Sequence, residues 1–454
     1  MGGLPQEHAQ EPSRGATHSA APATGPGAGA ASPPGALAAI YNECVHCGFC
    51  LPICPTYDVL GTEMDNPRGR LYLMRALEEG RAEAGKAIAR HLDLCLGCRA
   101  CESECPSGVP YGEHLEKARE RLRDEKLRPL GTRLLEGAVL RAVALPAGAQ
   151  RVGAALLRAV VGSGLAGFAA RGPWRRMLPR RLRSGLALLA GSEPRAVSLP
   201  ALTPALGTRR LRAGFLQGCV SRWVAGPVNE AAVRLLTASG TEIAAPAGQG
   251  CCGALHLHSG DREGARRLAR ANIEAFESAG TLDAIVVTSA GCGSAMKSYG
   301  ALFEDDPAWR GRAAAFAARV KDALELLAES GAPPARRELR ATVAYHDACH
   351  LAHAQGVRAQ PRALLAAVPG LTLVPLADAD RCCGSAGIYN LLHPDVAAAI
   401  LEEKIARLEA SGASIVAAAN PGCLLQIASG ARAAGIPLRV AHPLELLDEA
   451  TRET

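Results

Sequence analysis

The chain contains the run Cys44-Val45-His46-Cys47-Gly48-Phe49-Cys50-Leu51-Pro52-Ile53-Cys54-Pro55. The same cysteine spacing returns in a second run at Cys95, Cys98, Cys101 and Cys105, followed by Pro106. Two-residue spacers let one loop present three thiolates to a cubane of iron and sulfide, while the cysteine before the proline reaches a neighbouring cluster. The two runs therefore predict two [4Fe–4S] clusters of the bacterial ferredoxin type.

Crossed ligation assigns the cysteines to two sets. We expect the first cluster on Cys44, Cys47, Cys50 and Cys105, and the second on Cys95, Cys98, Cys101 and Cys54. Structural zinc sites usually combine two separated cysteine pairs, which a triplet plus a Cys-Pro matches poorly. Crossed ligation keeps two clusters close together, an arrangement that suits electron transfer.

A second cysteine pattern occurs twice in the C-terminal half. Its members are Cys219, Cys251, Cys252 and Cys292 in one copy, and Cys349, Cys382, Cys383 and Cys423 in the other. The copies are offset by 130 residues at the first cysteine and by 131 at the other three. We infer a duplicated domain, and each copy is called a module below.

Short β-rich runs lead into the lone cysteines of both modules, at 214–217, 284–288, 342–345 and 414–418. Strands that alternate with helices predict a parallel sheet, and ligand sites in such sheets lie beyond the carboxyl ends of the strands. We expect one cysteine-lined site per module. Adjacent cysteines do not readily form a relaxed disulfide but can bridge or cap a metal centre.

Several histidines lie near the module cysteines. They are His256 and His258 after the first doublet, and His346, His350 and His353 around Cys349. We expect His346 and His350 to support ligands through hydrogen bonds. His393 and His442 are expected to be structural.

Composition narrows the class of protein. The chain has 454 residues, 48% of them hydrophobic, sixteen cysteines and a net charge of +6, which does not indicate nucleic-acid binding. We expect no signal peptide and no membrane-spanning segment. In the cytoplasm thiols stay reduced, so the cysteines indicate metal ligands rather than disulfides.

The predicted fold class is α+β multidomain, in which a small helical two-[4Fe–4S] ferredoxin-like domain precedes a duplicated α/β Cys-Cys-Gly domain. A helical pattern is expected at 71–90. Residues 127–189 carry eleven arginines and one acid, Glu136. They predict helices with solvent-facing arginines, or a docking face for an acidic partner or an anionic membrane surface. The predicted divisions are a disordered tail at 1–36, the ferredoxin-type domain at 37–126, an Arg-rich connector at 127–205, and modules at 206–335 and 336–454.

The chain resembles the iron–sulfur subunit of glycolate oxidase (glycolate dehydrogenase), and more widely proteins whose Cys-Cys-Gly domains are similar to those of heterodisulfide reductase. The resemblance covers roughly residues 42–447. It is carried by the first ferredoxin run and by the segments Asn66-Pro67-Arg68-Gly69-Arg70, Gly250-Cys251-Cys252-Gly253-Ala254, Ser289-Ala290-Gly291-Cys292-Gly293 and Cys382-Cys383-Gly384-Ser385-Ala386-Gly387.

The chain departs from the fullest form of that domain, which ends in C-x-x-C and supplies five thiolates to a non-cubane cluster. Ser289 and Asn420 stand where the first cysteine of that pair would be. Each module therefore offers four thiols, which leaves open an ordinary cluster, a zinc ion or a thiol site for passing electrons.

The resemblance implies an electron-transfer subunit without catalytic residues of its own, in an oxidoreductase complex acting on the CH–OH group of a 2-hydroxy acid. Its partner would be a flavoprotein, carrying FAD, that oxidises glycolate to glyoxylate and in some cases D-lactate to pyruvate. Electrons would continue to a quinone or another membrane acceptor, with the chain cytoplasmic or peripheral on the inner membrane. The alternatives are a subunit of a lactate or anaerobic glycerol-3-phosphate dehydrogenase, a heterodisulfide or quinone reductase catalytic at its Cys-Cys-Gly site, and an assembly scaffold whose clusters never turn over.

Overall fold

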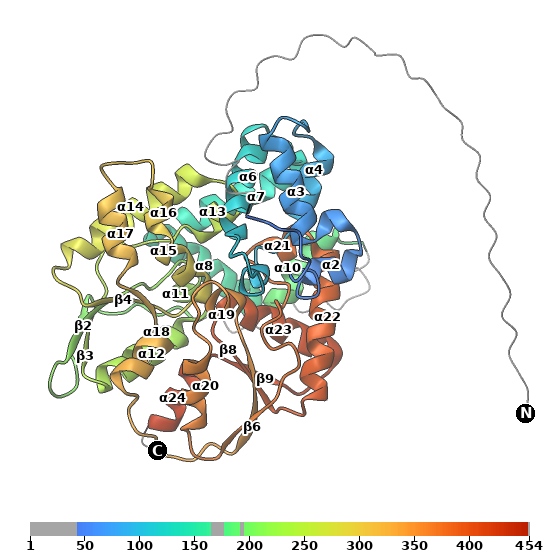
Figure 1. The fold of residues 1–454 in the computed structure, drawn as a ribbon. Helices are drawn as coiled ribbons and strands as arrows, with labels where there is room; N and C mark the ends of the chain where they lie inside the picture. The colour runs from blue at the N-terminus through green and yellow to red at the C-terminus, as the bar shows by residue number, and fades with distance from the viewer. Residues whose placement is uncertain (1–42, 165–176, 191–194, 453–454) are drawn as a thin grey trace, which may run out of the picture.

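The computed structural model describes residues 43–164, 177–190 and 195–452. The predicted tail at 1–36 lies outside these residues. The ferredoxin-type helices occupy one end of the molecule, and the two sheets lie below them (Figure 1). This arrangement puts the N-terminal cysteine runs against the modules, as the contacts below establish.

Short helices and loops build the ferredoxin-type region. The helices are α2 (Pro55–Leu60), η1 (Glu63–Asp65), α3 (Pro67–Glu78), α4 (Lys86–Asp93), α5 (Ala100–Ser103) and α6 (Tyr111–Asp124). The single helical pattern expected at 71–90 was wrong in extent, because α3 ends at Glu78 and α4 begins at Lys86. Gly80 adopts a φ of 67° between them, a left-handed conformation that interrupts a helix. Leu71, Met74 and Leu115 pack among the buried residues here.

The Arg-rich connector is helical where the structure describes it. It forms α7 (Leu130–Ala144), α8 (Ala147–Gly162) and α10 (Arg180–Leu189). Glu136 is not a surface acid: it is buried and binds Arg128 at 3.1 Å and Arg123 at 2.8 Å. Arg128 is also buried and forms a second salt bridge, with Asp93 at 2.8 Å. The connector is therefore tied into the ferredoxin-type region by charge pairs that solvent screens weakly.

The first module has a five-stranded sheet in the order β1-β3-β2-β4-β5. Only β1 runs antiparallel to its neighbour, and the remaining pairs are parallel. The strands are β1 (Leu202–Thr203), β2 (Leu211–Phe215), β3 (Thr241–Ala244), β4 (Ala284–Val287) and β5 (Val320–Asp322). The helices are α11 (Ser221–Val224), α12 (Gly226–Ala238), α13 (Ala254–His258), α14 (Arg262–Ser278), α15 (Ala290–Lys297), α16 (Tyr299–Leu302), α17 (Arg310–Ala317) and α18 (Ala323–Ser330).

The second module repeats the plan with four parallel strands in the order β7-β6-β8-β9. The strands are β6 (Ala341–His346), β7 (Leu371–Val374), β8 (Ile415–Ala418) and β9 (Arg439–Ala441). The helices are α19 (Cys349–Ala352), α20 (Ala359–Ala366), α21 (Tyr389–Leu392), α22 (Pro394–Ala410), α23 (Pro421–Ala434) and α24 (Pro443–Thr451). The duplicated α/β architecture expected from the cysteine spacing is confirmed.

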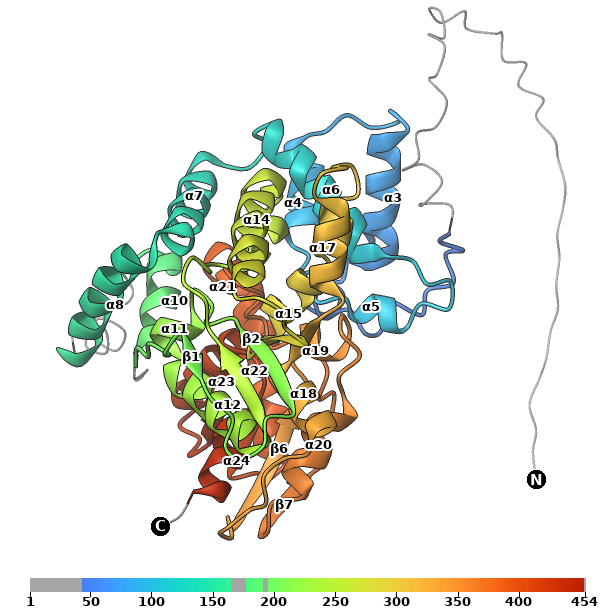
Figure 2. The ribbon, with the colours of Figure 1, turned by 90° about the vertical axis from the view of Figure 1, so that its left-hand side faces the viewer.

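The two modules share one continuous hydrophobic core. Helices α12 and α18 contribute Leu235 and Leu327 from the first module, while α23 and α24 contribute Ile427 and Leu444 from the second. Figure 2 shows α12 and α24 side by side at the end of the molecule opposite the ferredoxin-type helices. Burial on both sides fixes the modules against each other. The domain boundaries proposed from the sequence remain a prediction.

Candidate metal centres

The first predicted cluster set converges around one small cavity near the molecular surface. Cys44, Cys47, Cys50 and Cys105 all line it. Burial raises the pKa of the Cys50 thiol to about 11, while Cys47 is exposed. A bound metal would favour the thiolate over the thiol. These four thiols fit the predicted [4Fe–4S] cluster, and one face of their site is open to solvent.

The second predicted set lies deeper. Burial raises the pKa of both Cys98 and Cys101, and the nearby thiols of Cys95 and Cys54 raise it further. The Tyr111 hydroxyl and the Gly97 N–H each lie 3.4 Å from the Cys95 sulfur as donors. Converging thiols with donors aimed at sulfur are what an iron–sulfur cluster requires. The four residues fit the second cluster.

A buried cation stands beside the second set. The Arg70 side chain is fully buried and donates to the Thr56 hydroxyl at 2.9 Å and the His91 carbonyl at 2.8 Å. Thr56 Oγ1 in turn lies 3.3 Å from Cys54 Sγ. Although burial opposes it, the pKa of Arg70 is raised by the Cys95, Tyr111, Cys54 and Asp65 groups. Arg70 therefore places a permanent positive charge next to these thiols.

In the first module the four cysteines gather at the carboxyl ends of β2 and β4, as predicted. Cys219 follows β2, the doublet precedes α13, and Cys292 lies in the first turn of α15. Cys219 Sγ and Cys251 Sγ are 3.4 Å apart. Hydrogen bonds from Cys219 and Cys252 hold the pKa of Cys251 well below its usual range. The four thiols of the first module therefore lie together, and the pKa of Cys251 is lowered by its neighbours.

The second module repeats this geometry. Cys349 begins α19, the doublet lies in the loop before α21, and Cys423 lies in the first turn of α23. Contacts between neighbouring thiols link Cys349, Cys382, Cys383 and Cys423 in series. Gly384 follows the doublet with a φ of 85°, and a Cβ there would lie 2.7 Å from the Ala397 carbonyl oxygen. Only glycine fits this turn without strain.

The two positions that depart from the five-cysteine pattern meet at the module interface. Ser289 Oγ lies 3.1 Å from Asn420 Oδ1, and Asn420 Nδ2 lies 3.6 Å from Cys423 Sγ. The two residues join the modules beside the thiols.

A cavity of about 370 Å³ lies between the modules. Its wall includes all eight module cysteines and Cys95 of the second ferredoxin run. The remaining wall is largely apolar and includes Val139 and Val143 of α7, Leu188 of α10 and Leu391 of α21. Two thiol sites and the second cluster loop thus border one space.

The second ferredoxin run packs directly onto the second module. His350 Nε2 lies 3.0 Å from the Gly97 carbonyl oxygen, and Tyr389 donates to the Leu94 carbonyl at 2.9 Å. Leu96 is buried among residues that include Cys382 and Tyr389. The hydrogen bond of His350 goes to the Gly97 carbonyl rather than to a thiol, so its supporting role toward the ligands stays a prediction.

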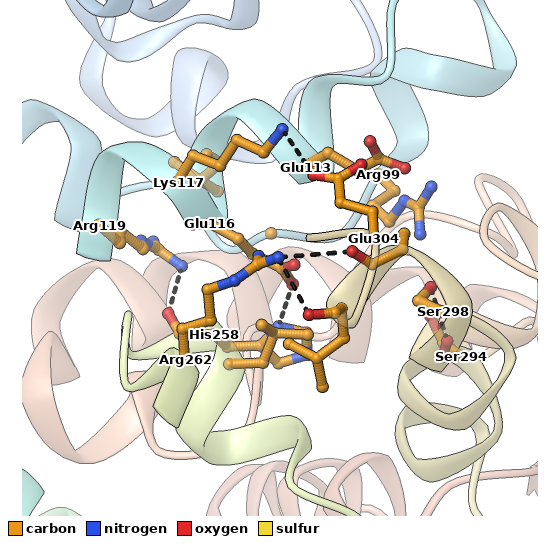
Figure 3. Close-up of a pocket in the computed structure, with 16 residues that line it drawn as sticks. Arg99, Glu113, Glu116, Lys117, Arg119, His258, Arg262, Ser294, Ser298 and Glu304 are labelled. Carbon is orange, nitrogen blue, oxygen red and sulfur yellow. Dashed lines mark hydrogen bonds and ion pairs between the residues drawn. The ribbon is translucent and has the colours of Figure 1, made fainter. Parts of the chain in front are cut away.

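The first module meets the ferredoxin-type region through charged groups. Glu116 pairs with His258 at 3.0 Å, and Lys117 pairs with Glu304 at 3.6 Å, around a pocket of about 50 Å³ (Figure 3). Arg119 donates to the His258 carbonyl at 3.1 Å. These contacts fix the first module against α6.

The structure also places His346, the last residue of β6, beside two of the predicted thiols. Only a supporting role was predicted for it from the sequence. Its position three residues before Cys349, at the end of an apolar run, was the signal available in the sequence. Burial holds the pKa of His346 well below its usual range, so the imidazole is neutral. His442 instead caps α24, which agrees with its expected structural role.

Fold and site together define an iron–sulfur electron-transfer protein that joins a ferredoxin-type region to two cysteine-rich modules. The family described as "4Fe-4S dicluster domain" matches residues 40–109, and the family described as "Cysteine-rich domain" matches 213–297 and 343–428. The chain belongs to the family of glycolate oxidase iron–sulfur subunits, as full-length relatives establish.

Two relatives cover almost the whole chain. The probable glycolate oxidase iron–sulfur subunit of Bacillus subtilis (strain 168) is 38% identical over 416 residues, covering 90% of this chain and 93% of the relative. The glycolate oxidase iron–sulfur subunit of Escherichia coli (strain K12) is 34% identical, covering 90% and 94%. Lactate utilization protein A of Exiguobacterium sp. is 36% identical but covers only 52% of this chain.

Proposed function

We propose that this chain is the electron-transfer subunit of a glycolate dehydrogenase complex. A flavoprotein partner, carrying FAD, oxidises glycolate to glyoxylate, with D-lactate to pyruvate as a second reaction, and hands electrons to this chain. Clusters bound by the eight ferredoxin-type cysteines would supply one-electron acceptor chemistry, which divides the two-electron oxidation into single steps. The chain then delivers electrons to a membrane quinone, and it works on the cytoplasmic face of the inner membrane.

The observation that carries this proposal is the contact between the second ferredoxin run and the cavity. Cys95 lines the same space as the module thiols, and the His350 contact holds the Gly97 loop against Cys349. The chain thereby connects a solvent-facing cysteine site with an internal, largely apolar chamber. A chamber whose exposed wall is mostly apolar, with polar groups such as His350 and Asn420 among its lining, suits a quinone ring.

The surface beside the first cluster site has features that support the entry of electrons there. Val45 and Phe49 are 68% and 65% exposed beside the solvent-facing Cys47. Exposed apolar side chains next to a redox site are typical of a docking surface for another protein. This surface is where the flavoprotein would dock.

Helix α8 of the connector has a surface that supports contact with a membrane. On α8, Val152, Leu156 and Val160 recur every four residues and are 62%, 65% and 44% exposed. Arg151 and Arg158 on the same helix are exposed too. An apolar stripe flanked by arginines suits the surface of an anionic bilayer. Among the described residues, no helix is both long and apolar enough to cross a membrane.

The test is anaerobic reduction by glycolate in the complex reconstituted with its flavoprotein. We expect glycolate to reduce the iron–sulfur centres of the wild-type complex and to drive reduction of a soluble quinone. Cys47→Ser should abolish quinone reduction while the flavin content of the partner stays normal. Ser107→Ala is the matched control, because Ser107 lines the same cavity without a thiol.

Normal quinone reduction by the Cys47→Ser complex would overturn the proposal. Centres that dithionite reduces but glycolate never does would favour the scaffold alternative. Reduction by D-lactate but not by glycolate would place the chain with the lactate-oxidising relatives instead.

A further inference from the structure

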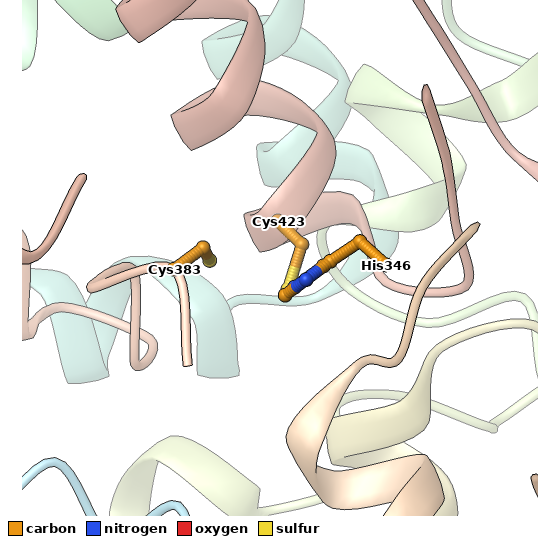
Figure 4. Close-up of side chains that lie close together, drawn as sticks. All are labelled: His346, Cys383 and Cys423. Atoms are coloured by element: carbon orange, nitrogen blue, oxygen red, sulfur yellow. The ribbon is translucent and has the colours of Figure 1, made fainter. Parts of the chain in front are cut away.

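Three side chains of the second module converge on one buried point. His346 ends β6, Cys383 follows in the doublet loop, and Cys423 begins α23 (Figure 4). A ring nitrogen of His346 and the two sulfur atoms all lie within 4.8 Å of one another, and all three residues are buried. Elements distant in the sequence therefore supply one nitrogen and two sulfur donors to the same place.

The His346 side chain is fully buried, and neither of its ring nitrogens makes a well-formed hydrogen bond to another described residue. A backbone group of Ala379 lies near the ring, but it does not satisfy hydrogen-bond geometry. Buried polar atoms without partners are rare in folded proteins and call for an explanation. A metal ion would satisfy one nitrogen of this ring.

The spacing of the three donors suits a single ion. A tetrahedral zinc ion with bonds of about 2.3 Å to sulfur and about 2.0–2.1 Å to nitrogen sets its ligand atoms about 3.5–3.8 Å apart. The observed separations, within 4.8 Å, need only small side-chain movements to reach those values. Mixed nitrogen and thiolate donors are also the set that zinc prefers.

The first module differs at this position. Three residues before Cys219, where the second module has His346, stands Leu216. Leu216 is buried and packs in the core of the first module. Although the cysteines are duplicated, the imidazole is not, so the modules offer different donor sets.

We propose that the second module binds one zinc ion through His346, Cys383 and Cys423. Cys383 and Cys423 both line the central cavity, and the Cys382 thiol contacts Cys383. Either a ligand from the cavity or the Cys382 thiol would complete a tetrahedral zinc shell. The inference goes beyond the proposed function, because it concerns a metal ion bound by this chain outside the ferredoxin-type region. Because zinc does not change oxidation state, this module would border the path of electrons rather than carry them.

The test is metal analysis and zinc-edge X-ray absorption of the purified full-length chain. We expect about one zinc ion per chain, with nitrogen and sulfur both in its coordination shell. His346→Leu, which installs the residue of the first module, should remove at least about nine-tenths of that zinc, whereas His346→Cys should retain it because thiolate also binds zinc. His442→Leu is the matched control, since His442 is equally buried but faces the Thr288 carbonyl at 3.1 Å.

The iron content and the reduced-cluster spectrum of each variant report whether the ferredoxin-type region is still intact. Full zinc retention by His346→Leu, or a wild-type chain without zinc, would overturn the inference. An all-sulfur zinc shell would overturn it as well. None of these results depends on glycolate oxidation, so failure here is distinct from failure of the proposed function.

Discussion

Ser289 Oγ lies 3.1 Å from Asn420 Oδ1, so equivalent positions of the two modules touch each other. The contact lies at the start of α15 and α23, directly beside Cys292 and Cys423. A hydrogen bond at this point couples the relative position of the modules to the geometry of their thiols.

Removal of either partner should weaken this interface. We expect Ser289→Ala and Asn420→Ala each to lower the free energy of unfolding by about 1–2 kcal/mol, because a polar group at a largely buried contact loses its partner. The double variant should lose less free energy of unfolding than the two single variants lose in sum. The difference, which is the coupling energy, should be about 1 kcal/mol. Urea unfolding of all four proteins measures this coupling, and strictly additive costs would show that the contact contributes nothing.

Cys252→Ser tests whether the first module takes part in electron delivery. Cys252 lines the central cavity and contacts Cys251 and Cys292. We expect quinone reduction to fall by at least about tenfold, a barrier increase of about 1.4 kcal/mol, while glycolate still reduces the ferredoxin-type centres. Ser298→Ala, within the same module but outside the thiol cluster, should leave both reactions unchanged. Unaltered quinone reduction by Cys252→Ser would make the first module purely structural.

Phe49→Glu tests the docking surface beside the first cluster. A buried charge in place of a central aromatic contact should cost about 2 kcal/mol of binding to the flavoprotein, or roughly thirtyfold in Kd. Titration of the flavoprotein by calorimetry measures the change. Leu206→Glu is a suitable control, because Leu206 is equally exposed at 66% but lies in the first module. Equal affinities of both variants would place the docking surface elsewhere.

Arg70→Leu should lower the reduction potential of the second cluster. The buried guanidinium stabilises added negative charge on the nearby thiolates, and a loss of about 1.4 kcal/mol of that stabilisation corresponds to about 60 mV for one electron. Arg70→Lys keeps the charge and should shift the potential less. Arg75→Leu, on the same helix but partly exposed, is the control. A redox titration monitored by electron paramagnetic resonance measures the reduction potential of the second cluster. An equal potential in Arg70→Leu and the wild type would contradict this role.

Acid should destabilise the fold through His442. Burial lowers the pKa of His442 to about 3, whereas an unfolded histidine titrates near about 6.5. Between these values only the unfolded state takes up the proton. The neutral ring therefore makes its full contribution to the free energy of unfolding above about pH 6.5. Below that pH the contribution falls by about 1.4 kcal/mol per pH unit. His442→Leu should flatten the pH dependence of the urea midpoint between pH 6.5 and 4, and parallel curves for both proteins would exclude this contribution.

The cysteine spacing predicted most of the architecture because metal ligands constrain both sequence and fold. The runs expected at 284–288, 342–345 and 414–418 correspond to β4, β6 and β8, since short apolar runs before a ligand end at the carboxyl edge of a parallel sheet. The doublets follow β3 and β7 only after loops of several residues, and no cysteine directly follows β5 or β9, so the cysteine pattern did not mark these four strands.

Contacts across distant segments could not be predicted from the sequence. The placement of His346 against Cys383 and Cys423 depends on how three separate elements meet, and a lone histidine carries no periodicity. The burial of Glu136 could not be predicted either, because it depends on pairing with Arg123 and Arg128 in the folded chain. An acidic side chain is usually exposed, but its ion pairs with the two arginines allow this one to be buried.

The contact between Gly97 and His350 also constrains the order in which the protein matures. The two residues are 253 positions apart, so the loop that carries Cys98 stays uncovered until most of the chain has been synthesised. At about 5–20 residues per second, the ribosome needs on the order of 10–50 s to pass from Gly97 to His350. In the folded chain Cys101 is buried, while Cys98 is half-buried. Iron and sulfide delivered before the last module folds therefore meet an uncovered loop, whereas iron and sulfide delivered afterwards meet a loop against which the second module is packed.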